Sequence, residues 1–127
     1  MCMGYYNLGQ SYHNGDGVDI DKKKAKHYYE LAAMDGSVYA RYNLGVIEGQ
    51  TGNYHKAMKH YMLSARAGDD DSLNTVKQGF MARYVTKDEY ANTLREYQKS
   101  QNEMISDTRD KAAAVLAEYR VTREAQL

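Results

Sequence analysis

The chain has 127 residues, with 17 basic and 17 acidic side chains, one cysteine and no proline. Its balanced charge disfavours a general nucleic-acid or membrane binder, and the single Cys2 excludes an internal disulfide and a cysteine-rich metal site. The sequence contains no apolar run close to the roughly 20 residues of a membrane-spanning helix. Its first residues lack the basic stretch and apolar core of a signal peptide. We therefore expect one domain in an intracellular, cytoplasmic protein.

The first predicted helix is apolar on one face. That face consists of residues at helical spacing: Tyr5, Leu8, Gly9 and Tyr12. A glycine inside a helix costs about 1 kcal/mol relative to alanine. The placement of a glycine at Gly9, and again at Gly45, therefore predicts that another helix crosses closely at each position.

A second helix follows a glycine- and aspartate-rich loop at residues 14–21. Either Asp19 or Asp21 is suited to cap it by accepting a backbone N–H bond. Its predicted stripe alternates small and large side chains, so that two helices can interlock: Ala25, Tyr28, Tyr29, Ala32 and Ala33. Gly36 ends the helix.

The pattern then repeats. Tyr6-Asn7-Leu8-Gly9 is identical to Tyr42-Asn43-Leu44-Gly45, 36 positions later, whereas Lys24-Ala25 matches Lys56-Ala57 at a spacing of 32. The second copy therefore has a loop four residues shorter between its two helices, and a solenoid tolerates such a change. The second unit predicts helices near Val38–Gly49 and Asn53–Ala67.

A third unit is degenerate. Its apolar spacing suits a helix from about Asp70 to Arg83. Thr86 and Glu89 form a capping box, which opens a helix carrying Tyr90, Leu94 and Tyr97.

A last predicted helix runs from Ser106 to about Glu124. One side is apolar, with Ala112, Ala113, Leu116 and Tyr119, and charged residues lie elsewhere. A polar outer face of this kind is expected of the helix that caps the end of a solenoid.

The first unit resembles the Sel-one-like repeat, a relative of the tetratricopeptide repeat. The motifs that carry the resemblance are Leu8-Gly9, Tyr12, Gly15-Asp16-Gly17-Val18, Asp21, Lys24-Ala25, Tyr28-Tyr29, Ala32-Ala33 and Gly36. The second unit departs from the pattern, with Glu48 at the position of Tyr12 and no Gly-x-Gly-Val loop. The resemblance covers residues 3–72 well and 73–100 loosely.

The resemblance implies an all-α fold, an α/α superhelix (solenoid) of about three helix-turn-helix repeats plus a C-terminal capping helix. We expect one helical-repeat domain over residues 1–127. Its expected parts are repeat one at 3–37, repeat two at 38–69, a degenerate repeat three at 70–100 and the capping helix at 101–127.

In tetratricopeptide-like stacks, the first helix of each pair lines a concave groove. Counting from each repeat leucine predicts the groove-facing residues: Tyr6, Asn7, Gln10 and His13 in the first unit, and Tyr42, Asn43, Val46 and Gly49 in the second. The two asparagines would hydrogen-bond a bound peptide, and the two tyrosines would stack on its side chains. The alternative is that both Tyr-Asn pairs only belong to the repeat's architecture.

Other sites have less support. The loop from Asn14 to Asp21 fits no EF-hand register, because the required glycine and glutamate are missing, and no histidine pair has the i, i+4 spacing of a helical zinc site. Lys22-Lys23-Lys24 with Lys26 either touches an acidic partner or, the favoured reading, only solvates a helix start. The sequence has no activated nucleophile motif, phosphate loop or clustered acid pair. We expect no enzyme, no cofactor and no metal.

The expected function is that of an interaction scaffold or adaptor, which binds a partner peptide or domain in the concave groove. The alternative is a structural fragment of a longer repeat array without a binding site of its own. We expect a protein partner and neither nucleic acid nor membrane. We also expect weak self-association at the N-terminal end, where Met1, Met3 and Tyr5 would be uncovered.

Overall fold

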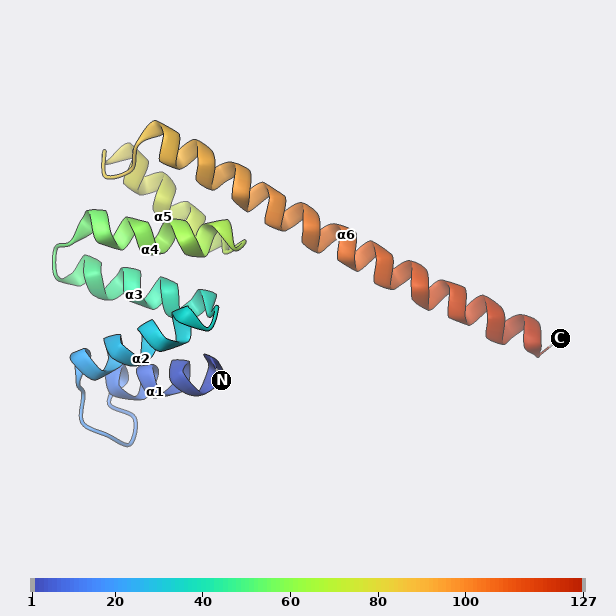
Figure 1. Ribbon diagram of the computed structural model, residues 1–127, viewed down its shortest axis with the longest axis horizontal. Helices are drawn as coiled ribbons and strands as arrows, with labels where there is room; N and C mark the ends of the chain where they lie inside the picture. The colour runs from blue at the N-terminus through green and yellow to red at the C-terminus, as the bar shows by residue number, and fades with distance from the viewer. Residues whose placement is uncertain (1, 127) are drawn as a thin grey trace.

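The computed structural model describes residues 2–126, which form six helices and no strand. These helices are α1 (Cys2–Asn14), α2 (Lys22–Met34), α3 (Val38–Gln50), α4 (Tyr54–Arg66), α5 (Asp70–Met81) and α6 (Lys87–Ala125). Helices α1 to α5 lie side by side in chain order, and α6 starts beside α5 and extends away from the stack (Figure 1). The predicted all-α solenoid is confirmed. None of the described helices is both long enough and apolar enough to cross a membrane.

Side-chain caps fix the starts of α2, α3, α5 and α6. Of the two aspartates proposed to cap α2, the structure selects Asp21, whose carboxylate accepts a hydrogen bond from Lys24 N at 3.1 Å. The predicted capping box of α6 is also present, with Glu89 N donating to Thr86 Oγ1 at 3.1 Å and Thr86 N donating to Glu89 Oε1 at 2.9 Å. Each bond satisfies a backbone N–H that the first helical turn leaves unpaired.

Close helix crossings explain the glycines inside the helices. A Cβ atom at Gly9 would lie 2.6 Å from the ring of Tyr29 in α2, and one at Gly45 would lie 2.8 Å from the ring of Tyr61 in α4. The predicted crossings are therefore confirmed. Gly79 in α5 lies at a different close approach, to α4 of the preceding repeat, where a Cβ would meet the side chain of Met58.

The buried residues form two clusters, which meet at α3. The first joins α1, α2 and α3 around Tyr29 and Leu44, and the second joins α3 to α6 around Tyr61 and Val76. Each repeat thus shares its core with the next, as stacked repeats do. This sharing fixes how the first helices of successive repeats, α1, α3 and α5, lie relative to one another.

The last element corrects our expectation. Residues 101–127 were expected to form a separate capping helix, but α6 continues from Lys87 to Ala125 for 39 residues. No proline or glycine interrupts this segment, and polar residues such as Lys, Gln and Glu are good helix formers. The first part of α6 covers the third repeat, where Ser100 Oγ donates to Arg66 O at 2.6 Å and Gln101 Nε2 donates to Gly68 O at 3.0 Å. Residues 102–126 are all exposed.

Candidate protein-binding pocket

A cavity of about 250 Å³ opens on the face formed by the first helices of the three repeats. Its lining comes from α1, α3 and the start of α5: Tyr6, Tyr39, Tyr42, Asn43, Asp69 and Asp71. We call it the tyrosine pocket. It brings together three of the residues predicted to bind a partner, Tyr6, Tyr42 and Asn43. Sequence reasoning missed the other three.

Two of the pocket's rings are held in place from behind. The ring centroid of Tyr6 lies 6.0 Å from that of the buried Tyr29, and Tyr42 meets Tyr61 edge-on at 5.5 Å. The Tyr6 hydroxyl also accepts a hydrogen bond from Gln10 Nε2 at 2.8 Å. Because of this support, two walls of the pocket are preorganised. The third ring, Tyr39, lies 6.2 Å from Tyr6 and is 67% exposed.

The acidic side of the pocket belongs to the start of α5. Asp69 caps this helix, and its Oδ2 accepts hydrogen bonds from Ser72 N at 3.0 Å and Ser72 Oγ at 2.6 Å. Asp71 is exposed in the first turn. Within residues 2–126, neither carboxylate forms an ion pair. Acidic residues also stabilise a helix N-terminus by themselves, so their presence alone does not establish binding.

The remaining predicted residues lie on the same helices but outside the pocket. Asn7 is exposed, and Gln10 is hydrogen-bonded to Tyr6. His13 meets the Tyr29 ring edge-on at 6.1 Å, and Val46 packs against the second core cluster. His13 and Val46 therefore contribute to packing in this structure.

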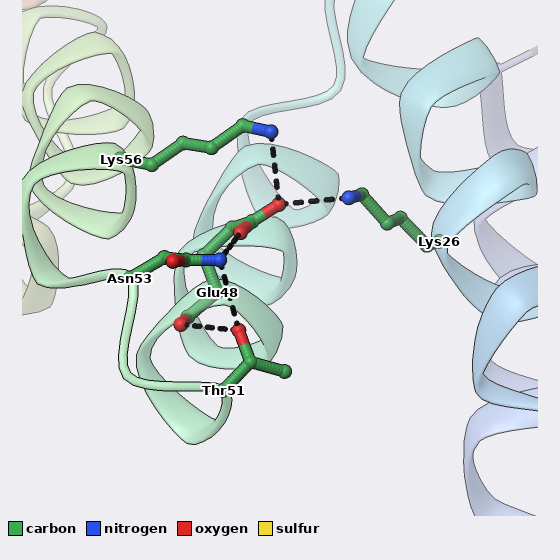
Figure 2. A network of polar contacts seen from close by, with 5 residues as sticks. All are labelled: Lys26, Glu48, Thr51, Asn53 and Lys56. Atoms are coloured by element: carbon green, nitrogen blue, oxygen red, sulfur yellow. Dashed lines mark hydrogen bonds and ion pairs between the residues drawn. The ribbon is translucent and has the colours of Figure 1, made fainter.

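A buried carboxylate, Glu48, lies between the first two repeats (Figure 2). It is 2% exposed. Its Oε1 lies 2.9 Å from the Nζ atom of Lys26 in α2 and 3.6 Å from that of Lys56 in α4, and its Oε2 accepts a hydrogen bond from Asn53 Nδ2 at 3.1 Å. The Asn53 amide also donates to Thr51 Oγ1 at 3.2 Å, and this hydroxyl donates to the Glu48 carbonyl at 2.9 Å.

The surroundings of Glu48 favour its charged form. The hydrogen bond from Lys26 holds the pKa of Glu48 below its usual value despite the opposing effect of burial. The same hydrogen bond raises the pKa of Lys26. The network occupies the carboxylate with partners from its own chain, so we assign it to repeat stacking and not to ligand binding. One member of the lysine run, Lys26, thus has an acidic partner inside the molecule.

In the first repeat, an aromatic side chain occupies the position that Glu48 has in the second repeat. Tyr12, at the position equivalent to Glu48, stacks on Tyr28 with ring centroids 5.7 Å apart and an interplanar angle of 7°. The Nζ of Lys24 lies 5.2 Å from the Tyr12 centroid. Since Lys24 corresponds to Lys56, a lysine of the second helix contacts this position in both repeats, once through a cation–π interaction and once through an ion pair.

Metal binding gains no geometric support. Across the described part of the chain, no three His, Cys, Asp or Glu side chains come together in a way that would hold a metal ion. This includes the loop at residues 14–21, which was considered for calcium. At the other end of the stack, Met3 is 66% exposed and Tyr5 stacks on Tyr28 at 6.4 Å, whereas Met1 lies outside the described residues. Self-association there stays a prediction.

Comparison with known proteins gives one family. The family model described as Sel1 repeat matches residues 2–37 and 38–69, together more than half of the chain. A sel1-like repeat-containing protein of Acanthamoeba polyphaga mimivirus is 39% identical over 62 residues. That match covers 49% of this chain and 12% of the viral protein, so the chain spans only a small part of that relative.

Proposed function

The chain belongs to the Sel1 repeat family, whose helical repeats generally serve as protein–protein interaction modules, and on that premise we propose that it is an interaction scaffold. In this proposal the face formed by α1, α3 and α5 holds a segment of a partner protein. The observation that carries the proposal is the tyrosine pocket, because all three repeats contribute to it.

The lining of the pocket suggests the chemistry of the partner. Tyrosine rings attract cations through their faces, and two carboxylates without an ion-pair partner lie beside them. The N-terminus of α5 carries a partial positive charge of about +0.5, which repels a cation. This charge is smaller in magnitude than the negative charge of the two carboxylates. The balance is negative, so we infer that the pocket receives a lysine or arginine side chain.

The size of the pocket favours a single side chain. At about 250 Å³ it lies below the roughly 300–1,000 Å³ of typical small-molecule sites. Tyrosine and arginine are also common anchors in interfaces between proteins. In the lining of the pocket, the Asn43 amide offers both a donor and an acceptor to a peptide backbone. These features support a peptide segment with one basic anchor residue.

Selection from a randomised peptide library tests this function. We expect the wild-type protein to enrich sequences with lysine or arginine at one fixed position. Asp71→Asn and Tyr39→Ala should weaken binding of the selected peptide by about tenfold, which corresponds to 1.4 kcal/mol. Asp16→Asn, the same charge change in the exposed loop at residues 14–21, serves as the matched control and should bind normally.

Two different failures can be separated. If no peptide is enriched, this face does not bind peptide segments, and the alternative of a structural repeat unit without a site of its own gains support. If peptides are enriched without a basic residue, or if binding is indifferent to Asp71→Asn, the scaffold function holds but the proposed chemistry of the pocket is wrong.

A further inference from the structure

The outer half of α6 presents a largely apolar stripe, which includes two threonines, and nothing in the described chain covers it. Beyond Gln101, residues at alternating spacings of three and four lie on one face of the helix: Ile105, Thr108, Ala112, Val115, Tyr119 and Thr122. This alternation is the heptad pattern of a coiled-coil seam. Ile105, Val115 and Tyr119 are 50%, 64% and 61% exposed.

The stripe lies on the same face of α6 that packs against the third repeat closer to the stack. Closer to the stack, the same side of α6 places Tyr90 against Phe80 with ring centroids 4.8 Å apart, and it joins Tyr97 to Asp70 by a hydrogen bond. The helix then leaves the stack and projects into solvent (Figure 1). In proteins, most of the stability of a helix comes from packing one of its faces against other elements, and the projecting part of α6 has no such packing in the described chain. Its one ion pair, Lys111 with Asp107 at 3.0 Å, joins two exposed side chains and adds little stability.

We propose that the outer halves of α6 from two copies of this chain pair as an antiparallel coiled coil. The twofold axis would cross between Ala113 and Ala114. In this register, Ile105 meets Thr122 of the second copy, Thr108 meets Tyr119, and Ala112 meets Val115. Each larger side chain lies opposite a smaller one, and every contact occurs twice, as an interface with twofold symmetry requires.

The flanking charges fit the same register. Lys111 comes directly before the seam residue Ala112, and Glu118 comes directly before the seam residue Tyr119. The two charged residues therefore flank the same side of the seam, one heptad apart. Across the twofold axis, Lys111 lies opposite Glu118 of the second copy, so two complementary pairs form. Such flanking pairs set partner choice and orientation in coiled coils.

A parallel pair satisfies charge but not packing. It would place Glu118 opposite Arg123 of the second copy, which is also attractive. However, its seam would oppose Tyr119 to Tyr119 and Ala112 to Ala112, crowding one layer and leaving another underfilled. It would also bring the two repeat stacks together at one end, whereas the antiparallel pair separates them. Side-chain volume therefore decides the orientation.

A membrane surface is a less suitable partner for the stripe. Helices that lie on membranes are rich in Lys and Arg on their polar face. Residues 105–126 instead carry four acidic and four basic side chains: Asp107, Asp110, Glu118, Glu124, Arg109, Lys111, Arg120 and Arg123.

The length and composition of the seam predict a weak dimer. The seam covers about 27 Å of helix at 1.5 Å per residue, and several of its residues are small, so dimer formation should depend on protein concentration.

Sedimentation equilibrium on the full chain tests the proposal. We expect a reversible monomer–dimer equilibrium. Val115→Asp should raise the dissociation constant by at least about tenfold. Val121→Asp is the matched control, because Val121 is 67% exposed on the opposite face of the same helix, and it should leave the dimer unchanged.

A charge swap tests the orientation even where Val115→Asp weakens the helix itself. Lys111→Glu and Glu118→Lys should each weaken the dimer, and the double variant should restore it. This restoration cannot come from the helix's own pair, because Asp107 still faces a glutamate in the double variant. A chain that is monomeric at all concentrations, a dimer indifferent to Val115→Asp, or a double variant without restoration would overturn the antiparallel pair.

Discussion

Lys26 of the first repeat and Glu48 of the second are joined by an ion pair of 2.9 Å, and Glu48 is almost completely buried. The pair lies where successive repeats stack, and Lys56 of the second repeat approaches the same oxygen atom (Figure 2). The departure of the second repeat from the Tyr12 pattern is therefore compensated by cations from both repeats.

Removal of the carboxylate should destabilise the stack. Breaking a fully buried pair costs about 3–5 kcal/mol, but the side chains of Lys26 and Lys56 are 36% and 60% exposed, so water compensates part of the loss. We expect Glu48→Ala to lower the free energy of unfolding by about 1–3 kcal/mol. Urea unfolding measures this, with Glu103→Ala as the exposed control. Equal midpoints for the two variants would contradict a role of Glu48 in stacking.

The same pair makes stability depend on pH in a defined direction. Because the folded-state pKa of Glu48 is lowered from 4.5, its stabilisation is present above that value and is lost as the pH falls through the folded pKa. Because the pKa of Lys26 is raised from 10.5, its contribution is present below that value and is lost as the pH rises further. The difference in unfolding free energy between the wild type and Glu48→Gln should therefore shrink at both extremes. A difference independent of pH would show that the charges do not matter.

The close approach of α3 and α4 should make Gly45 intolerant of any side chain. A Cβ atom at this position would lie 2.8 Å from the Tyr61 ring, so Gly45→Ala should destabilise by about 1–3 kcal/mol through overpacking. Gly49 in the same helix is the control, because a Cβ there would come no closer than 4.0 Å, to Ala57. Gly49→Ala should be neutral or stabilise by up to about 1 kcal/mol. Chemical denaturation of both variants distinguishes the two sites.

The repeats could be predicted from sequence because their signals are local. A glycine inside an amphipathic helix, such as Gly9 or Gly45, indicates a close crossing, and a residue such as Asp21 indicates a helix start. The continuity of α6 was not predicted: two helices were expected, one carrying Tyr90 to Tyr97 and one beginning at Ser106, although neither glycine nor proline lies between them. Polar residues alone do not end a helix; a glycine or proline would have done so.

The candidate site was only partly predictable, because it depends on how repeats stack. Tyr6, Tyr42 and Asn43 follow from positions within each repeat. Asp71 belongs to the next repeat and Asp69 caps its first helix, so their distance from Tyr42 depends on the offset between α3 and α5. The partners of Glu48 posed the same difficulty: Lys26 lies in another repeat, although the replacement of the repeat tyrosine by a glutamate was a visible signal that compensating cations should be sought.

The backbone at Arg83 should be strained, and replacement by glycine should relieve this strain. It is the single residue other than glycine with positive φ among the described residues, at 69°, and it follows α5 where Gly36 follows α2 with φ 96°. The left-handed region costs non-glycine residues roughly 1–2 kcal/mol, which exceeds the entropy that glycine adds to the unfolded chain. Arg83→Gly should raise the melting temperature, and Gly36→Ala should lower it. A lower melting temperature for Arg83→Gly would mean that the arginine side chain makes a compensating contribution.

The two halves of α6 should differ sharply in local stability. The first half is held by the hydrogen bonds of Ser100 and Gln101 to the turn after α4, whereas residues 102–126 are exposed on all sides. Because most helical stability in proteins comes from packing, we expect amide hydrogen exchange at low protein concentration to be slow between Tyr90 and Ser100 and fast beyond Gln101.

Raising the protein concentration should then slow exchange in the outer half alone, if that half pairs with a second copy. The Val115→Asp variant should show fast exchange there at every concentration, while its first half stays protected. Uniform slow exchange along all of α6 in dilute solution would show that the outer half is stable as a single helix. In that case the apolar stripe would not need a partner for its stability, and the sedimentation result alone would decide whether two copies pair.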